Sequence, residues 1–124
     1  MSAVQNLSAK AALDTLMSVD GAVAAALCDK NSGMVLATAG SGLDLEVAAA
    51  GNADVLRAKE RVARSLGFSD AIEDLLITLS TQYHIIRPVR SGPGLFLYLA
   101  CSRDRANLAM ARRKMQDIES MITI

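Results

Sequence analysis

The chain has 124 residues, of which 52% are hydrophobic and only 3% aromatic. This length supports one hydrophobic core, so we expect a single domain over residues 1–124. Thirteen basic and thirteen acidic residues cancel, which argues against nucleic acid as a partner, because non-specific nucleic-acid binders need clustered excess positive charge.

The first predicted elements are a helix and a hairpin. Between about residues 8 and 18, apolar side chains recur on one side, which is typical of a surface helix. The apolar runs 22–29 and 34–38 predict two antiparallel strands. Gly33 supplies the positive φ that a bulged return between them needs. We expect residues 39–42 to form a flexible loop.

The longest predicted element is a helix over residues 43–66, with Asp44 as its N-cap and Gly67 after its end. Apolar residues lie on two sides of it. The stripe that we expect to cover the sheet consists of Val47, Gly51, Val55, Ala58, Val62 and Leu66. The second zone consists of Ala49, Ala53, Leu56 and Ala63, and Glu60 is assigned to the same interface. A monomer's surface helix rarely needs two apolar sides, so we predict that the second zone binds another copy of the chain. The alternative is that these alanines only favour helix formation.

Three strands and a helix are predicted to follow. The strands cover residues 74–80, 83–89 and 95–101. The connection at Thr81 and Gln82 lacks the residues of a tight two-residue turn, so we expect a longer loop there. Ser102 and Asp104 are expected to cap the last helix. Its apolar side consists of Leu108, Ala111, Met115, Ile118 and Ile122, and its solvent side of Arg105, Arg112, Arg113, Asp117 and Glu119.

The predicted order is α-β-β-α-β-β-β-α. Short connections within each run of strands require mostly antiparallel pairing. The expected fold is therefore an α/β domain of the α+β kind, with a five-stranded antiparallel sheet flanked by helices.

Four segments carry a resemblance to a known family: residues 19–21, the hairpin 22–38 with its return 33–37, the alanine-rich helix 47–66, and residues 107–112. In this order and spacing, over nearly the whole chain, the sequence resembles the Roadblock/dynein light chain family. The resemblance implies a profilin-like, longin-related fold that forms a homodimer through its second helix and the neighbouring sheet edge. It also implies a regulator or scaffold of a small Ras-like GTPase, or a dynein light chain-type motor adaptor. The compact Ala- and Arg-rich chain looks more like the bacterial type.

Few residues offer catalytic chemistry. His84 is the only histidine and has no carboxylate beside it in sequence, so we expect a structural role for it. Cys28 and Cys101 lie in apolar runs, as buried reduced thiols do, and the resemblance places their strands side by side. The Gly40-Ser41-Gly42 segment lacks the spacing of a phosphate-binding loop. We therefore predict no enzyme, no cofactor, no metal site and no small-molecule substrate.

The expected location is cytoplasmic. Reduced thiols fit a reducing compartment, and the longest apolar run is too short to span a bilayer. Residues 1–13 hold one lysine and no continuous apolar run, so no secretion signal is predicted.

Three arginines in the basic C-terminal third form a candidate partner surface, because an acidic protein would be steered towards them: Arg87, Arg90 and Arg112. Two other functions are weighed. A small-molecule sensor of the GAF or PAS type would need a roomy pocket with polar and aromatic anchors. A thiol- or His-dependent enzyme would need a nucleophile, a base and an orienting group brought together by folding.

Overall fold

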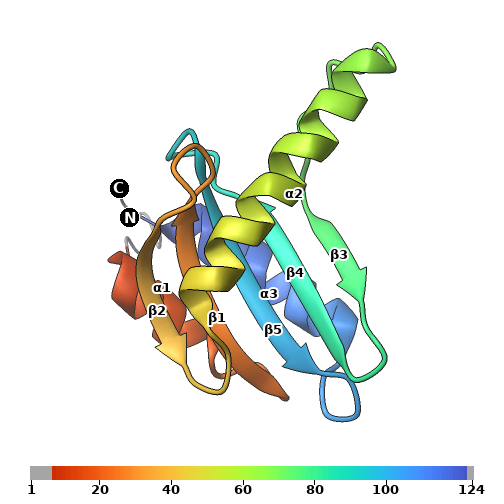
Figure 1. Ribbon diagram of the computed structural model, residues 1–124. Coiled ribbons are helices and arrows are strands. Elements are labelled where there is room, and N and C mark those ends of the chain that lie inside the picture. The colour runs from red at the N-terminus through yellow and green to blue at the C-terminus, as the bar shows by residue number, and fades with distance from the viewer. Residues whose placement is uncertain (1–6, 123–124) are drawn as a thin grey trace, which may run out of the picture.

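The computed structural model describes residues 7–122. Residues 1–6, on which the prediction of no secretion signal partly rests, lie outside this range. The elements are α1 (Ala9–Leu16), β1 (Ala22–Asp29), β2 (Val35–Gly40), α2 (Leu45–Ser65), β3 (Leu75–Thr78), β4 (Gln82–Pro88), β5 (Leu95–Ser102) and α3 (Leu108–Met121). This order confirms the prediction (Figure 1).

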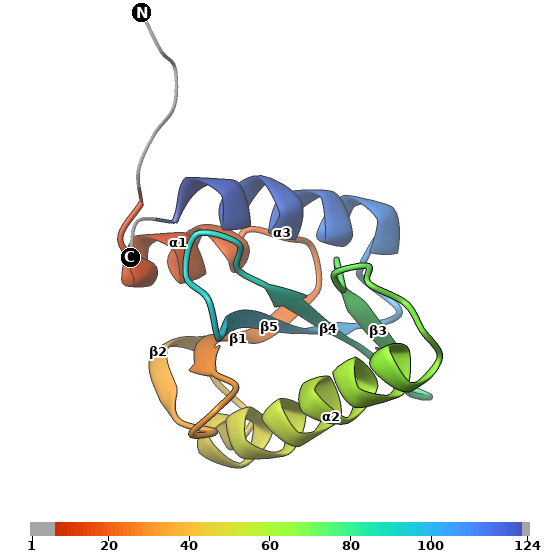
Figure 2. The same cartoon turned by 90° about the horizontal axis from the view of Figure 1, so that it is seen from above.

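The strands form a single five-stranded sheet in the order β2-β1-β5-β4-β3, and every neighbouring pair is antiparallel. The chain leaves the sheet at one edge after β2 and returns at the other edge with β3, so α2 crosses the sheet diagonally between them (Figure 1). Figure 2 shows that α2 covers one face of the sheet alone, while α1 and α3 share the other.

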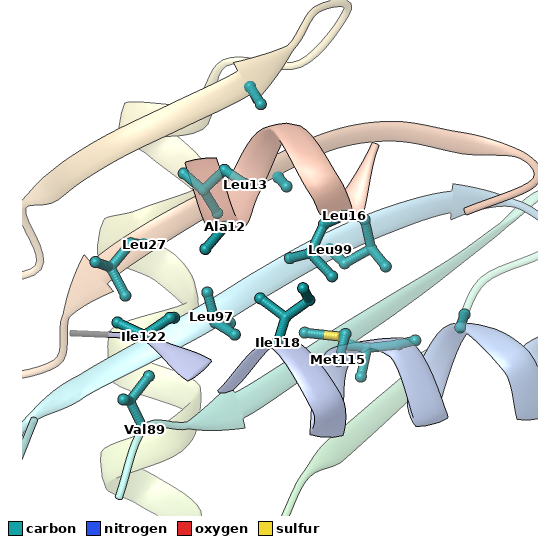
Figure 3. Close-up of a cluster of buried hydrophobic side chains, with 14 of the residues drawn as sticks. Ala12, Leu13, Leu16, Leu27, Val89, Leu97, Leu99, Met115, Ile118 and Ile122 are labelled. Carbon is teal, nitrogen blue, oxygen red and sulfur yellow. The ribbon is translucent and has the colours of Figure 1, made fainter. Parts of the chain in front are cut away.

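The face below α1 and α3 carries an aliphatic core. Leu13 of α1 and Met115 of α3 are fully buried against Leu97 and Leu99 of β5 (Figure 3). Successive residues of a strand point to opposite faces, so Phe96, which lies between the strand's leucines, joins the core below α2 instead. The two faces of the sheet therefore have separate cores of different composition.

The turns before and after β2 each contain a glycine with a positive φ. Gly33 has a φ of +74° and the register shifts between Leu27 and Cys28, which confirms the bulged return. The prediction of a loop over residues 39–42 is wrong in its first half, because Ala39 is a buried strand residue. Gly40 ends the strand with a φ of +82°, and a Cβ there would lie 2.4 Å from the carbonyl oxygen of Val23.

The caps of the helices are partly as predicted. Asp44 accepts a hydrogen bond from the backbone N–H of Val47 and caps α2. The prediction for α3 is wrong, since Asn107 is its N-cap and accepts from the N–H of Met110 at 3.1 Å. Ser102 and Asp104 bond to each other in the connection before it. Within residues 7–122, no helix has both the length and the apolar character that crossing a bilayer requires.

Candidate functional site: the exposed side of helix α2

Helix α2 packs on the sheet through its small residues. Ala49, Ala53 and Leu56 have no exposed surface and contact the core that contains Phe96 and Tyr98. The prediction that these three bind a second copy is therefore wrong, because they are already buried within the chain. The physical reason lies in the sheet. Two aromatic rings fill the layer below α2, so the helix approaches only where its own side chains are small.

The other two residues of that predicted zone also lie within the chain's own contacts. Glu60 accepts hydrogen bonds from the Lys30 ammonium at 2.8 and 3.0 Å. Ala63 is half-buried and lines a hollow of about 360 Å³ under the last turns of α2, together with Phe68, Ile72 and others. Glu60 and Ala63 follow Leu56 by about one turn and about two turns, so they are on the sheet-facing side of the helix.

The apolar stripe that the sequence assigns to the sheet points away from it instead. The exposed fractions are 67% for Val47, 43% for Val55, 46% for Val62 and 66% for Leu66. Gly51 is exposed between them, and Ala58 is half-buried. We call these six residues the α2 stripe. Contiguous exposed aliphatic side chains mark interaction sites on folded proteins, which makes the α2 stripe the candidate functional site.

One flank of α2 is fixed by the β1–β2 turn. Lys30 forms an ion pair with Glu60, and its carbonyl oxygen accepts a hydrogen bond from the Arg57 guanidinium. Arg57 also binds Asp54 one turn earlier. Gly33 packs close to Ala50. The helix is thus held rigidly by the turn on this side, while its opposite flank adjoins an open part of the sheet (Figure 1).

A polar cluster on β4 and β5 extends from the buried Tyr98 to the half-buried His84 and Gln82. The Tyr98 hydroxyl is 3.1 Å from Nδ1 of His84, and Nε2 of His84 is 2.7 Å from the Gln82 amide oxygen. Burial lowers the pKa of His84, and burial together with the Cys28 thiol raises the pKa of Tyr98 to about 12. Among residues 7–122, no carboxylate lies within ion-pair distance of His84, so the imidazole has no partner that would make it a strong base.

The two thiols do not meet. Their strands are neighbours, as the resemblance implies, but Cys28 is paired with Phe96 and Cys101 with Ala22, at opposite ends of the pairing. They also belong to the two different cores. Burial raises the pKa of Cys28 to about 12 and that of Cys101 to about 11. Little thiolate is present at neutral pH, and the thiolate is the reactive form. Residues 7–122 contain no cluster of three side chains suited to a metal ion.

The three arginines of the predicted partner surface differ in position. Arg87 is only 6% exposed and its Nε donates to Glu119 at 3.1 Å, so its assignment to that surface is wrong. Arg112 is half exposed and makes two hydrogen bonds of 3.0 Å with Asp74. Arg90 is exposed, and its backbone N–H donates to the second oxygen of Glu119.

The sequence pattern predicts that Glu119 lies on the solvent side of the last helix, and this prediction is also wrong. Glu119 is only 6% exposed, and its carboxylate joins α3 to β4 through Arg87. The sequence does hold a signal for this position. Glu119 follows Met115 by four residues and precedes Ile122 by three, so it lies beside the apolar side of the helix.

Solved structures share this arrangement. A Roadblock/LC7 domain from Streptomyces avermitilis matches with a TM-score of 0.79 at 16% identity, covering 93% of this chain and 92% of that one. MglB from Myxococcus xanthus matches with a TM-score of 0.80 at 19% identity, covering 90% of this chain and 89% of that one. An MglB with a tetrameric arrangement matches with a TM-score of 0.75 at 20% identity, covering 87% of this chain and 79% of that one.

No protein-family model and no curated protein matches the sequence. The likeness to the solved structures is therefore one of fold, and it extends over nearly all of the chain. The chain has the Roadblock/LC7 fold that its sequence resemblance predicts.

Proposed function

We propose that this protein is a non-enzymatic, homodimeric regulator or scaffold that binds a small Ras-like GTPase and modulates its GTP turnover or its localisation. The observation that carries the proposal is the exposed α2 stripe on a Roadblock/LC7 fold, because the family resemblance assigns self-association to this helix. The tetrameric arrangement of one similar MglB structure supports self-association as well. The buried, protonated thiols, and an imidazole that pairs with Tyr98 and Gln82 and not with a carboxylate, support a role without catalysis.

The α2 stripe has the spacing of a self-complementary surface. Its residues follow one another at intervals of four, four, three, four and four, which read the same in both directions along the chain. Two copies of α2 packed antiparallel about a two-fold axis therefore place Val47 against the partner's Leu66 and Gly51 against the partner's Val62. Val55 then faces the partner's Ala58. In the two inner pairs a small residue receives a larger one, as close helix packing requires.

The length of the α2 stripe also suits a stable contact. From Val47 to Leu66 it extends over about 28 Å at the rise of an α-helix. A two-fold contact of this kind leaves the α1 and α3 side of each copy free. That side, and the charged flank of α2, are then available to a GTPase.

The first experiment measures the oligomeric state. Size-exclusion chromatography with light scattering should give about twice 13.1 kDa. Val55→Arg should give a monomer with an unchanged circular dichroism spectrum, because Val55 is 43% exposed and belongs to neither core. The matched control is Arg61→Glu, an exposed charge on the other flank of the same helix, which should stay dimeric. A wild-type monomer at tens of micromolar would refute the dimer.

The second experiment tests the partner. A small GTPase encoded beside this gene is mixed with the protein, and phosphate release and the release of fluorescent GDP are followed. We expect the wild type to change at least one of the two rates and Val55→Arg to change it less. The absence of both binding and a rate change would remove the GTPase-regulator function, even if the dimer is present.

The structure disfavours the small-molecule sensor. A sensor needs aromatic anchors around an open pocket, whereas Phe96 and Tyr98 are buried in packing below α2. A hollow of about 510 Å³ between residues 18–20 and α3 has no aromatic lining, and Phe68 is the one aromatic residue that lines the hollow of about 360 Å³. The alternative function, a dynein light chain-type motor adaptor, is supported by the family resemblance alone.

A further inference from the structure

A groove of about 510 Å³ lies between α3 and the segment that follows α1. Both helices are on the face of the sheet away from α2 (Figure 2). Val19 lines the groove from the segment after α1, and Ala109, Met110 and Lys114 line it from α3. We call the groove lined by these four residues the α3 groove.

The apolar part of the α3 groove is open to solvent. Met110 is 68% exposed, whereas the side of α3 that faces the sheet buries Ala111, Met115 and Ile118. Methionine is flexible and polarizable, so it adapts its shape to the apolar side chain of a partner, and it is enriched in protein interfaces. An apolar side chain from outside the chain can therefore pack between Met110 and Val19.

Most polar side chains that line the groove already have partners within the chain. Asn107 caps α3, and the Ser18 hydroxyl donates to a carbonyl oxygen of α1 at 2.7 Å. Arg113 forms an ion pair with Asp117 at 3.3 Å. Lys114 differs from these residues. It is half-buried, and within residues 7–122 it takes part in none of the ion pairs.

The unpaired charge of Lys114 favours an anionic group in the groove. A lysine that loses part of its water to burial gains from a carboxylate placed beside it, because a charge-assisted hydrogen bond replaces the lost hydration. Asp20 also lines the groove and carries the opposite charge, but it is exposed. Water solvates the Asp20 carboxylate, so it does not need a partner.

We propose that the α3 groove binds an acidic amphipathic helix of a partner protein. One apolar side chain of that helix packs between Met110 and Val19, and a carboxylate one turn further along the helix contacts Lys114. The spacing matches, because Met110 and Lys114 are themselves four residues apart on α3 and lie on the same side of it. Since α2 is on the other face of the sheet, the inference does not depend on the proposed homodimer.

The probe for this site is an alanine-rich peptide of about 18 residues, which is long enough to form a helix. It carries leucine and glutamate four residues apart along one side. A matched basic peptide has lysine in place of each glutamate. Fluorescence anisotropy of the labelled peptides is measured with the full chain at low salt. The chain should bind the acidic peptide at least about fivefold more tightly than the basic one.

Variants of the chain locate the binding. Lys114→Glu should reverse the preference between the two peptides, and Lys114→Gln should remove it. Met110→Asp should weaken the acidic peptide most, because it removes the apolar contact and adds a like charge. The matched control is Lys59→Glu, which changes an exposed lysine of α2 and should leave the preference as it is in the wild type. Circular dichroism checks that each variant is folded.

Three outcomes overturn the inference. One is an acidic peptide that does not bind, or that binds no more tightly than the basic peptide. Another is a preference that persists in Lys114→Glu, or that Lys59→Glu removes to the same extent, because the charge of the whole chain would then explain it. The third is a changed oligomeric state of Lys114→Glu in light scattering, since the groove would then hold a second copy of the chain.

Discussion

The two faces of the sheet differ in how completely the chain's own helices bury their apolar side chains. On the face of α1 and α3, two helices cover the strands, and the buried ion pair of Arg87 and Glu119 joins α3 to β4. On the face of α2, one helix covers the sheet through alanines and a leucine, while its larger aliphatic residues remain in water. The first face is complete within one chain. The second leaves aliphatic side chains of α2 exposed, which the proposed dimer would cover, so stability and the proposed interaction involve different layers of the molecule.

The largest test of this comparison changes two adjacent residues of α2. Leu56→Arg should abolish the cooperative thermal transition, because it places a charge in a fully buried core and costs about 5 kcal/mol or more. Val55→Arg, the next residue back, should keep the fold and lose only the dimer. Thermal unfolding followed by circular dichroism measures both. A folded, monomeric Leu56→Arg would mean that Leu56 faces a partner after all.

A second, smaller effect is expected on the opposite face. Glu119→Ala leaves the Arg87 guanidinium buried without its closest carboxylate and should lower the free energy of unfolding by about 3–5 kcal/mol. Urea denaturation measures this. The control is Asp117→Ala, which removes an exposed pair with Arg113 and should cost less than about 1 kcal/mol.

The double variant Arg87→Met with Glu119→Leu refines the second test. It replaces the buried pair by apolar side chains of similar size and should recover most of the stability, because no charge is then left without a partner. Equal losses for Glu119→Ala and Asp117→Ala would contradict the view that the ion pair completes this face.

Much of the fold was predictable because local patterns specify it. The alternation in residues 95–101, the helical spacing of residues 43–66 and the positive φ of Gly33 each depend on neighbours in sequence, and all three are confirmed. The family resemblance led to the same fold. Contacts between distant parts of the chain were harder to predict from the sequence. Arg87 and Glu119, which form a buried ion pair, are 32 residues apart.

The faces of α2 were assigned in reverse for a physical reason. Residue size alone suggests that the valine stripe belongs in the core. The choice depends on what the sheet presents, and the alternation of β5 places Phe96 and Tyr98 together on the α2 side. Rings of this volume require small residues opposite them. Matching the aromatic positions of β5 with the alanine zone of the helix would have given the observed orientation from sequence.

The smallest expected effect concerns Gly51. Its replacement by alanine should stabilise the single chain and weaken the proposed dimer. Gly51 lies within α2, and a Cβ there would meet no atom within 4 Å. Gly51→Ala should therefore stabilise the single chain by about 1 kcal/mol, because alanine favours the helix. In the proposed antiparallel dimer the same methyl group would meet the partner's Val62. Overpacking of about 1 kcal/mol at each of the two symmetric contacts then weakens the dimer by more than about tenfold. Urea denaturation of the Val55→Arg background measures the first effect, and sedimentation of the dimer measures the second.

Arg61→Ala, on the charged flank of α2, is the control and should leave the dimer unchanged. If Gly51→Ala strengthens both the fold and the dimer, the two copies do not approach at Gly51, and the antiparallel register is wrong.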